Sequence, residues 1–427
     1  MPNETEGSCW RAKANALDRY RWLLLRERHG ALGSTLRFAR DALIDWWFGF
    51  RAKRLLSANV VAEPCRFLLL QSSERVIGYR RKQHFMDALR GRGHDLTETA
   101  LATTAEILAS RNLVSPPEPL PTRYFGYAAY AEWLVERYQP RMLLNDRNGS
   151  LYSPFLRLSL NRRGRLLVHL AHATTVEASR RLGMNDYDYY FAFGRSSLDA
   201  LKARRLRFGD TRVVLSGSHM VDQAYDLPAA DPAIKTLLVL GVGPDKEKEP
   251  DYQKTYTLLE EWARANLDYH IKVKLHPRSR GAFWRQAASE LDHVEVLPDG
   301  VSLAQALAAS SVVVNIMSNA VIEAALAGRP VLYVAVGAQR DIFSQTTYFG
   351  SRIESSEQLS ERIRSLEPQA AVLKAQSFAE YHLANGVGGL TSTVEYLENL
   401  LAGLDIESHF LPHRLPAQRD LLRDQDD

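Results

Sequence analysis

The chain has 427 residues, of which 45% are hydrophobic and 24% are charged. This composition is that of a globular protein and excludes collagen and whole-chain disorder, and the two cysteines, Cys9 and Cys65, cannot form a disulfide scaffold or a CxxC zinc site. The net charge of +4 is too small to favour nucleic acid as a partner. The length is too great for one ordinary core, so we expect two domains. Because no apolar run of about 18 residues and no basic-then-apolar leader occur, we expect a cytoplasmic chain without a membrane span.

The first 56 residues combine aromatic and basic side chains. They hold eleven Lys or Arg against six Asp or Glu, and the aromatic run 46–50 comes directly before the basic cluster 51–54. Residues 10–56 therefore suit a helical extension that lies in an anionic membrane interface, on the inner face of the inner membrane. They also suit a helical arm that packs on the body and covers apolar surface with Arg stems. The sequence leaves both interpretations open.

From residue 57 onwards, predicted strands alternate with predicted helices in two series. In the first series, 57–225, we expect strands at 66–71, 141–145, 165–170, 189–193 and 213–215, helices at 84–92 and 127–138, and a loop at 115–121. In the second, 226–405, we expect strands at 235–240, 270–275, 294–297, 312–316 and 331–336, and helices at 252–266, 303–309 and 319–327. This alternation predicts an α/β protein with two doubly wound parallel-sheet domains, facing each other across a cleft and followed by a polar tail, 406–427. In such sheets, ligands bind beyond the carboxyl ends of the strands.

One candidate ligand site follows the strand 270–275. This strand contains Lys274 and runs directly into His276, Pro277 and Arg278. The proline fixes φ and ends the strand, which holds an imidazole and a guanidinium at the sheet edge. We expect these side chains to meet an anionic phosphate.

A second candidate follows the strand 312–316. Ser318 stands where a helix N-cap is expected, and the helix 319–327 ends at a glycine. Backbone N–H groups at such a helix start favour phosphate. Asn319 and Glu323 are four residues apart and share a helix face, and Glu323 is placed to accept two ribose hydroxyls unless it is simply a surface residue of an amphipathic helix. The turn Gly241–Gly243 ends another strand and lets backbone approach the same ligand.

These motifs carry a resemblance. KLHPRS at 274–279, followed by SNAVIEAALAGRPVLYV at 318–334, resembles the donor-binding half of GT-B glycosyltransferases, in the branch of polysialyltransferases, Kdo transferases and CDP-glycerol glycerophosphotransferases. The resemblance covers roughly 187–402. It implies that His276 and Ser318 contact the donor phosphate and that Glu323 holds the ribose or base. The acidic pair before a glycine that the sialic-acid branch uses is absent, since Asp299-Gly300 lies in the other half, so a CMP-sialate donor is disfavoured.

The first series should supply the acceptor site and a catalytic base. Asp146 follows the strand 141–145, and His172 follows the strand 165–170, where it resembles the His-Gly turn of the glycerophosphotransferases with alanine in place of glycine. Either could be the base; Glu177 is a weaker candidate, and His169 is expected in the core.

The sequence predicts no metal or other cofactor. Asp186 and Asp188 have the spacing of a DxD motif but lead into a strand of the acceptor half. A His/Arg cluster with a helix start can stabilise a leaving nucleotide electrostatically, so we expect metal independence.

Three classes of function fit this sequence. The first is a nucleotide-sugar-dependent, inverting glycosyltransferase that builds a surface glycan such as lipopolysaccharide or capsule, with a glycan or lipid-linked glycan as acceptor. The second is an enzyme of the same architecture with other chemistry, either a polyol-phosphate transferase or a sugar-nucleotide epimerase. The third is an inactive scaffold that binds glycan.

Overall fold

The computed structural model describes residues 10–175, 180–204, 206–231 and 233–413. The chain forms two compact units. Unit 1 comprises Met1–Ala192, Ser197–Ser216 and Thr393–Asp427, and unit 2 comprises Phe193–Ser196 and Gly217–Ser392. The predicted tail beyond residue 413 and the candidate Glu177 lie outside the described residues.

Unit 1 is built on a seven-stranded sheet in the order β12-β6-β5-β4-β3-β1-β2. All neighbours are parallel except β12, which pairs antiparallel with β6. The central strands are fully buried apolar runs, as expected for a parallel sheet covered on both faces. The strands are β1 (Phe67–Gln71), β2 (Leu96–Ala100), β3 (Met142–Asn145), β4 (Leu166–Leu170), β5 (Tyr189–Ala192), β6 (Thr211–Leu215) and β12 (His409–Leu411). The helices are α1 (Trp10–Arg26), α2 (Ala31–Arg54), α3 (Glu74–Gly78), α4 (Gln83–Gly91), α5 (Thr104–Ser110), α6 (Thr122–Tyr138), α7 (Ser153–Asn161), α8 (Arg195–Arg204) and α16 (Gly389–Leu401).

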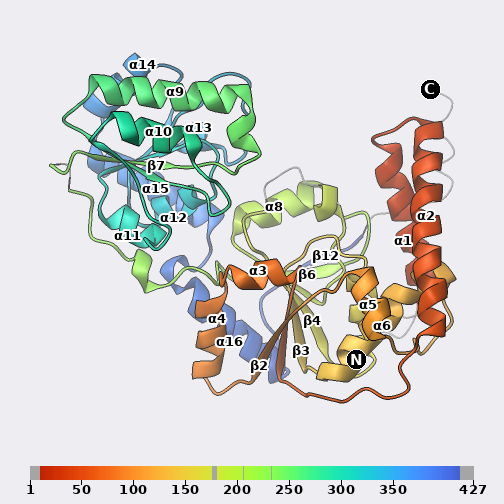
Figure 1. The fold of residues 1–427 in the computed structure, drawn as a ribbon. Helices are drawn as coiled ribbons and strands as arrows, with labels where there is room; N and C mark the ends of the chain where they lie inside the picture. The colour runs from red at the N-terminus through yellow and green to blue at the C-terminus, as the bar shows by residue number, and fades with distance from the viewer. Residues whose placement is uncertain (1–9, 176–179, 205, 232, 414–427) are drawn as a thin grey trace. The chain divides into compact units, whose positions relative to one another are not determined.

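Unit 2 has a five-stranded parallel sheet in the order β11-β10-β7-β8-β9. An apolar core joins one face of this sheet to α9, α10 and α14, and α12 and α15 lie on the other face (Figure 1). The strands are β7 (Thr236–Leu240), β8 (His270–Lys274), β9 (Val294–Val296), β10 (Val312–Asn315) and β11 (Val331–Tyr333). The helices are α9 (Pro250–Ala265), α10 (Ala282–Glu290), α11 (Leu303–Ala308), α12 (Ala320–Leu326), α13 (Gln345–Phe349), α14 (Ser356–Arg364) and α15 (Pro368–His382).

Both units are therefore doubly wound α/β folds, which confirms the predicted fold class. Two strands were missed. The edge strand β2 has a largely polar sequence, LTETA, and β12 has three residues, so neither carries the apolar signal of a central strand. The predicted segment 226–405 differs from unit 2, whose main segment runs from Gly217 to Ser392, so most of α16 belongs to unit 1. The predicted polar tail 406–427 is also not without regular structure, because β12 pairs there with β6.

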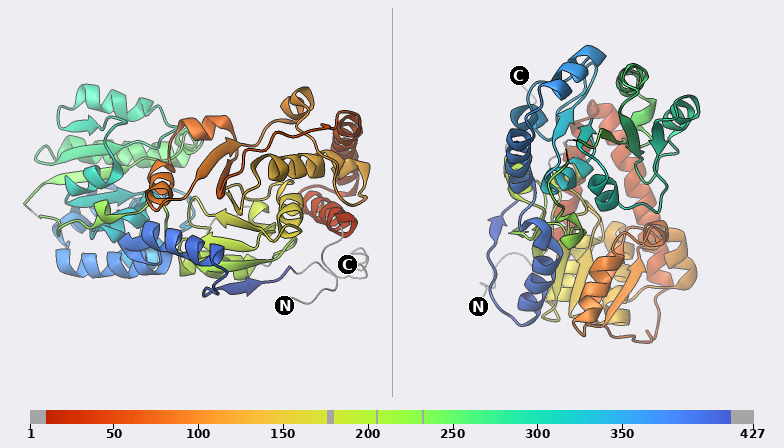
Figure 2. Two further views of the ribbon diagram at one scale, coloured as in Figure 1. Left: turned by 90° about the horizontal axis from the view of Figure 1, so that it is seen from below. Right: turned by 90° about the vertical axis from the view of Figure 1, so that its left-hand side faces the viewer.

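The helices α1 and α2 run side by side along one flank of unit 1 (Figures 1 and 2). Helix α1 buries Trp10, Ala14, Leu17 and Tyr20, and α2 packs along α6. The predicted helical extension is thus a helical hairpin with one face on the body. Among the described residues, no helix is both long and apolar enough to cross a membrane.

Candidate functional site

The sheet of unit 2 has a topological switch point between β7 and β10. From β7 the chain builds outward through β8 and β9, then returns to the other side of β7 to form β10 and β11. Ligands of open α/β sheets bind beyond the carboxyl ends of the strands at such a point. The segments that follow β7 and β10 are the predicted glycine turn and the predicted Ser318 loop. The two predicted loops therefore flank the switch point of unit 2.

The glycine turn after β7 lies directly against the turn after β8. The N–H of Gly241 donates to the carbonyl of Lys274 at 2.9 Å. A Cβ atom at Gly241 would lie 3.1 Å from Leu275 Cα and 3.2 Å from His276 N, which is closer than side chains normally approach backbone. The guanidinium of Arg278 is 3.8 Å from the position that a Cβ of Gly243 would take. Because Gly241 has no side chain, the turn after β7 can pack directly against the turn after β8.

His276 is half-buried at the end of β8. Its Nδ1 accepts a hydrogen bond from the N–H of Arg278 at 3.2 Å, so in the neutral ring the proton resides on Nε2. The hydroxyl of Ser279 donates to Glu247 at 2.5 Å and accepts from the N–H of Gly281, which holds the turn closed. Pro277 and Arg278 are exposed. The turn thus presents a ring N–H donor and a guanidinium at the carboxyl edge of the sheet.

The side chain of Lys274, also predicted to bind the donor, contacts the loop between β9 and α11. Its Nζ donates to the carbonyl of Val301 at 2.5 Å, in the loop between β9 and α11. Partial burial lowers the pKa of Lys274, and Asp299 partly offsets that effect. This ammonium is engaged by the neighbouring loop.

The loop after β10 is organised by the fully buried Asn315. Its Oδ1 accepts from the N–H of Ser318 at 3.0 Å, and its Nδ2 donates to Gln345 at 2.8 Å. The hydroxyl of Ser318 accepts from the N–H of Ala320 at 3.3 Å. The N-cap position is Asn319 rather than Ser318, and α12 has seven residues, one fewer at each end than predicted. Ser318 therefore stands one residue before the N-cap, and its hydroxyl still accepts a hydrogen bond from the first residue of the helix.

Glu323 lies on the first turn of α12 and is half-buried. Burial raises the pKa of Tyr225 above its usual range, and the nearby charge of Glu323 raises it further. The carboxylate therefore lies near Tyr225, which is in the first part of the main segment of unit 2. A fully surface-facing Glu is not what the structure has at this position.

The sheet of unit 1 has its own switch point, between β1 and β3. β2 lies on one side of β1, and β3 to β6 follow on the other. Gln71 ends β1, Asp146 follows β3, and His172 follows β4 after one intervening residue. The structure therefore brings the two predicted bases to neighbouring strand ends.

A buried ion pair occupies this edge. Nζ of Lys82 contacts Oδ2 of Asp146 and donates to Gln71 Oε1 at 3.1 Å. Gln71 in turn donates to Glu98 of β2 at 2.8 Å. Lys82 is 5% exposed and Asp146 is 8% exposed, and Asp146 Oδ1 has no hydrogen-bond partner among the described residues. A buried carboxylate oxygen without a partner is uncommon and marks a place where a ligand hydroxyl could bind.

His172 interacts with Asp146 through the main chain. The imidazole lies close to the main chain of Asp146, whose carbonyl favours the protonated ring. The side chain reaches solvent, yet loss of water around part of the ring lowers its pKa; Lys82 and Arg81 lower it further, while Asp146 opposes them. The ring is therefore neutral at pH 7, the state in which it can accept a proton.

Sequence reasoning missed Lys82 and Gln71. Lys82 is the third of three consecutive basic residues, after Arg80 and Arg81. Only the fold shows that Lys82 is the one of these three that is buried. Gln71 could have been found from the sequence, because it is a polar residue at the carboxyl end of a predicted strand. His169, expected in the core, is fully buried against the rings of Tyr187 and Tyr190.

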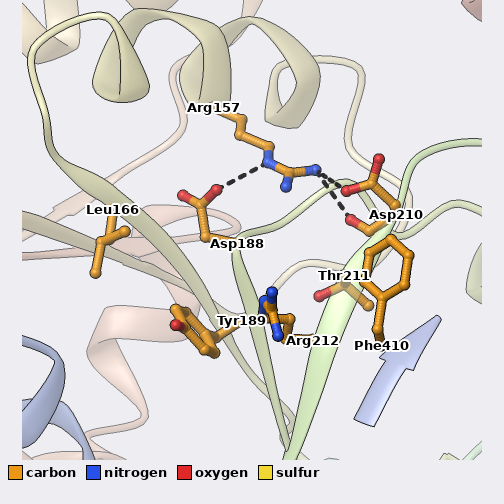
Figure 3. Close-up of a pocket in the computed structure, with 8 residues that line it drawn as sticks. All are labelled: Arg157, Leu166, Asp188, Tyr189, Asp210, Thr211, Arg212 and Phe410. Carbon is orange, nitrogen blue, oxygen red and sulfur yellow. Dashed lines mark hydrogen bonds and ion pairs between the residues drawn. The ribbon is translucent and has the colours of Figure 1, made fainter. Parts of the chain in front are cut away.

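The DxD-like pair lies at the opposite edge of this sheet. Arg157 contacts Asp186 at 2.8 Å. It also contacts Asp188 at 3.0 Å and Asp210 at 2.8 Å, and these three residues line a pocket at the amino ends of β5 and β6 (Figure 3). Burial would raise the pKa of Asp186, but Lys13 and Arg157 outweigh it and lower that pKa. These carboxylates are held by cations, away from the edge where ligands bind.

No family model and no curated protein matches this chain. Solved structures do. UDP-bound MnaA from S. aureus shares 12% sequence identity over 82% of this chain and 100% of that chain, with a TM-score of 0.52. A UDP-N-acetylglucosamine 2-epimerase shares 12% identity over 81% of this chain and 99% of that chain, with a TM-score of 0.50. The likeness is one of fold, and it confirms that the chain has the GT-B fold. The narrower resemblance to the polysialyltransferase branch stays a prediction.

Proposed function

We propose that this protein is a glycosyltransferase that transfers a sugar from a nucleotide-sugar donor to a hydroxyl of a surface glycan, such as lipopolysaccharide or capsule. The observation that carries the proposal is the pair of polar carboxyl edges, one in each unit. Unit 2 offers neutral and cationic donors for phosphate, and unit 1 offers a neutral histidine beside a buried Lys–Asp pair. A transferase needs both sets of groups, because it must bind a leaving nucleotide and activate an acceptor.

The donor nucleotide would bind at the switch point of unit 2. The turn at Gly241 and Gly243 brings backbone close to the ligand, and the N–H of His276 Nε2 and the hydroxyl of Ser318 would donate to its phosphates. Glu323 would accept hydrogen bonds from the ribose. Preorganised donors of this kind stabilise the negative charge that develops on the leaving phosphate.

The acceptor hydroxyl would bind at the carboxyl edge of unit 1. His172 would take its proton, the acceptor oxygen would bond to the anomeric carbon, and the bond from that carbon to the nucleotide phosphate would break. Asp146 is the weaker candidate for the base, because Lys82 already contacts its carboxylate. We assign Asp146 the task of orienting His172 through its carbonyl and the acceptor through Oδ1.

A sugar-nucleotide epimerase is the second candidate function. What favours it is the fold likeness to UDP-N-acetylglucosamine 2-epimerase and to UDP-bound MnaA. An epimerase changes the sugar without any acceptor, whereas a transferase releases nucleotide only when an acceptor is present.

The first experiment measures thermal shifts with CMP, CDP, UDP, GDP and their sugars on the wild type and on His276→Ala. We expect one nucleotide class to raise the melting temperature of the wild type. The same nucleotides should raise the melting temperature of His276→Ala much less. The stabilised sugar nucleotide is then incubated without acceptor and followed by NMR. Inversion at a ring carbon with no release of nucleotide would replace the transferase by the epimerase. Absence of any shift would refute the donor site and favour the inactive scaffold.

A further inference from the structure

Helix α2 has two opposite faces. Its buried residues are Ser34, Asp45, Phe48, Gly49 and Ala52, which face α1 and α6. Successive helix residues are about 100° apart, so residues 32, 36, 43, 47 and 50 fall on the side opposite to that buried face. The hairpin therefore packs on the body and still presents a continuous outer stripe.

Contacts on the buried face fix the rotation of α2. A Cβ atom at Gly49 would lie 1.7 Å from the carbonyl oxygen of Thr122, and one at Gly126 would lie 2.4 Å from the ring of Phe48, so the backbones of α2 and α6 approach closely. Asp45 is 4% exposed and accepts from Arg21 at 2.6 Å and from Tyr127 at 2.7 Å. The helix cannot turn its outer stripe inward without breaking these contacts.

The outer stripe is apolar and exposed. The described residues include thirteen exposed large hydrophobic side chains, and six of them belong to this one helix. Trp47 is 54% exposed, and Trp46 stacks on Phe50 with ring centroids 5.2 Å apart. Leu32, Leu36, Leu43 and Trp47 lie on the outer stripe, and Ile44 and Trp46 flank it on either side. Such a concentration on one helix marks an interaction surface, since single exposed apolar residues are normally scattered.

Cations lie on the same side, at the C-terminal end of the stripe. Arg51 lies over the ring of Trp47 at 5.6 Å, and Arg54 lies over the ring of Phe50 at 3.9 Å. Of the two acids in α2, Asp45 is buried and Asp41 contacts Arg40 at 2.8 Å. In the described part of the chain, neither Arg51 nor Arg54 pairs with an acidic side chain, so the outer face combines tryptophans, aliphatic side chains and positive charge.

We propose that the outer face of α2 docks on an anionic lipid bilayer, with the helix lying in the plane of the interface. Tryptophan and leucine side chains enter the boundary between headgroups and acyl chains, and arginines meet lipid phosphates. At 24 residues, α2 is about 36 Å long and offers the stripe along its length. The α2 face of a second copy would offer these arginines no acidic partner, because Asp45 is buried against Arg21 and Asp41 contacts Arg40, whereas anionic headgroups supply the counter-charge.

The test is co-sedimentation of the full chain with lipid vesicles. One set is phosphatidylcholine alone, and in the other about a quarter of the lipid is phosphatidylglycerol. We expect binding to the anionic vesicles, weakened when salt is raised from about 0.1 M to about 0.5 M. The double variant Leu43→Gln/Trp47→Gln should reduce the partition coefficient by at least about tenfold. The double variant Arg51→Gln/Arg54→Gln should reduce it by about fivefold per residue on anionic vesicles only.

Matched controls change exposed residues elsewhere. Leu267→Gln/Leu373→Gln removes two exposed leucines, and Arg364→Gln/Lys374→Gln removes two exposed cations; both should bind as the wild type does. Equal urea midpoints show that the surface variants fold. Absence of vesicle binding by the wild type overturns the proposal. Binding of the two α2 variants that equals that of the wild type also overturns it. A wild-type dimer that dissociates in Leu43→Gln/Trp47→Gln without any vesicle binding assigns the face to a second copy and also overturns it.

Discussion

The buried His382 makes the stability of unit 2 depend on pH. It lies at the end of α15 and is 1% exposed, with Nδ1 2.8 Å from the hydroxyl of Ser196 and Nε2 3.1 Å from the carbonyl of Phe343. In the neutral ring, Nε2–H donates to this carbonyl and Nδ1 accepts from the serine. Burial lowers the pKa of His382 from 6.5 to about 4, against smaller opposing effects of the Phe343 carbonyl and Asp341.

The sign follows from proton uptake in the two states. Between pH 6.5 and about 4, the unfolded chain binds a proton at this imidazole and the folded protein does not. The free energy of unfolding therefore falls as pH decreases through this window, and this histidine has no such effect above it. At about 1.4 kcal/mol per pKa unit, the stabilisation lost by pH 4 approaches about 3 kcal/mol.

Urea denaturation of the wild type and of His382→Gln isolates this contribution. At about pH 7.5 the variant should be less stable, because it loses contacts with the rings of Phe343 and Phe378. At about pH 4.5 the difference between the two proteins should shrink by about 2.5 kcal/mol, because the variant has no imidazole to protonate. His270→Gln, which removes an exposed imidazole, is the matched control. An unchanged difference at the two pH values would refute the reasoning.

Three further outcomes are expected. Lys82→Met should destabilise the protein by about 3–5 kcal/mol in urea denaturation, and K82M/D146L should recover much of this loss; equal losses would contradict a buried ion pair. Gly49→Ala should cost about 1–3 kcal/mol, whereas Gly33→Ala on the same helix, with a Cβ 3.5 Å from its neighbour, should be neutral or stabilising. Nucleotide-sugar turnover should persist in EDTA; activity restored only by Mg²⁺ or Mn²⁺ would show a required metal.

The central strands of both sheets were predictable because parallel strands covered on both faces are short, continuous apolar runs. The strands β1, β4 and β7 start and end within one residue of their predicted bounds. The edge strand β2 and the antiparallel β12 were not predictable, since polar or very short segments become strands only when a neighbour offers hydrogen bonds.

The candidate site shows the same division. The turn after β8 and the loop after β10 could be placed at a sheet edge from strand endings and turn residues alone. The directions of the side chains could not be predicted in this way. Lys274 contacts the carbonyl of Val301, and Lys82, the last of three consecutive basic residues, contacts Asp146. Burial of one cation among three depends on packing from elements far apart in the chain.

The sequence by itself determined the α/β class, the two doubly wound sheets and the strand ends that carry the candidate site residues, because apolar periodicity and turn chemistry are local properties. Only the tertiary structure decided that Asp146 and His172 meet beside Lys82. It also decided that α2 packs through Gly49 while keeping Trp47 exposed, an arrangement that the sequence left open between packing and membrane binding. These features depend on which faces meet across long sequence separations, and no local pattern records that.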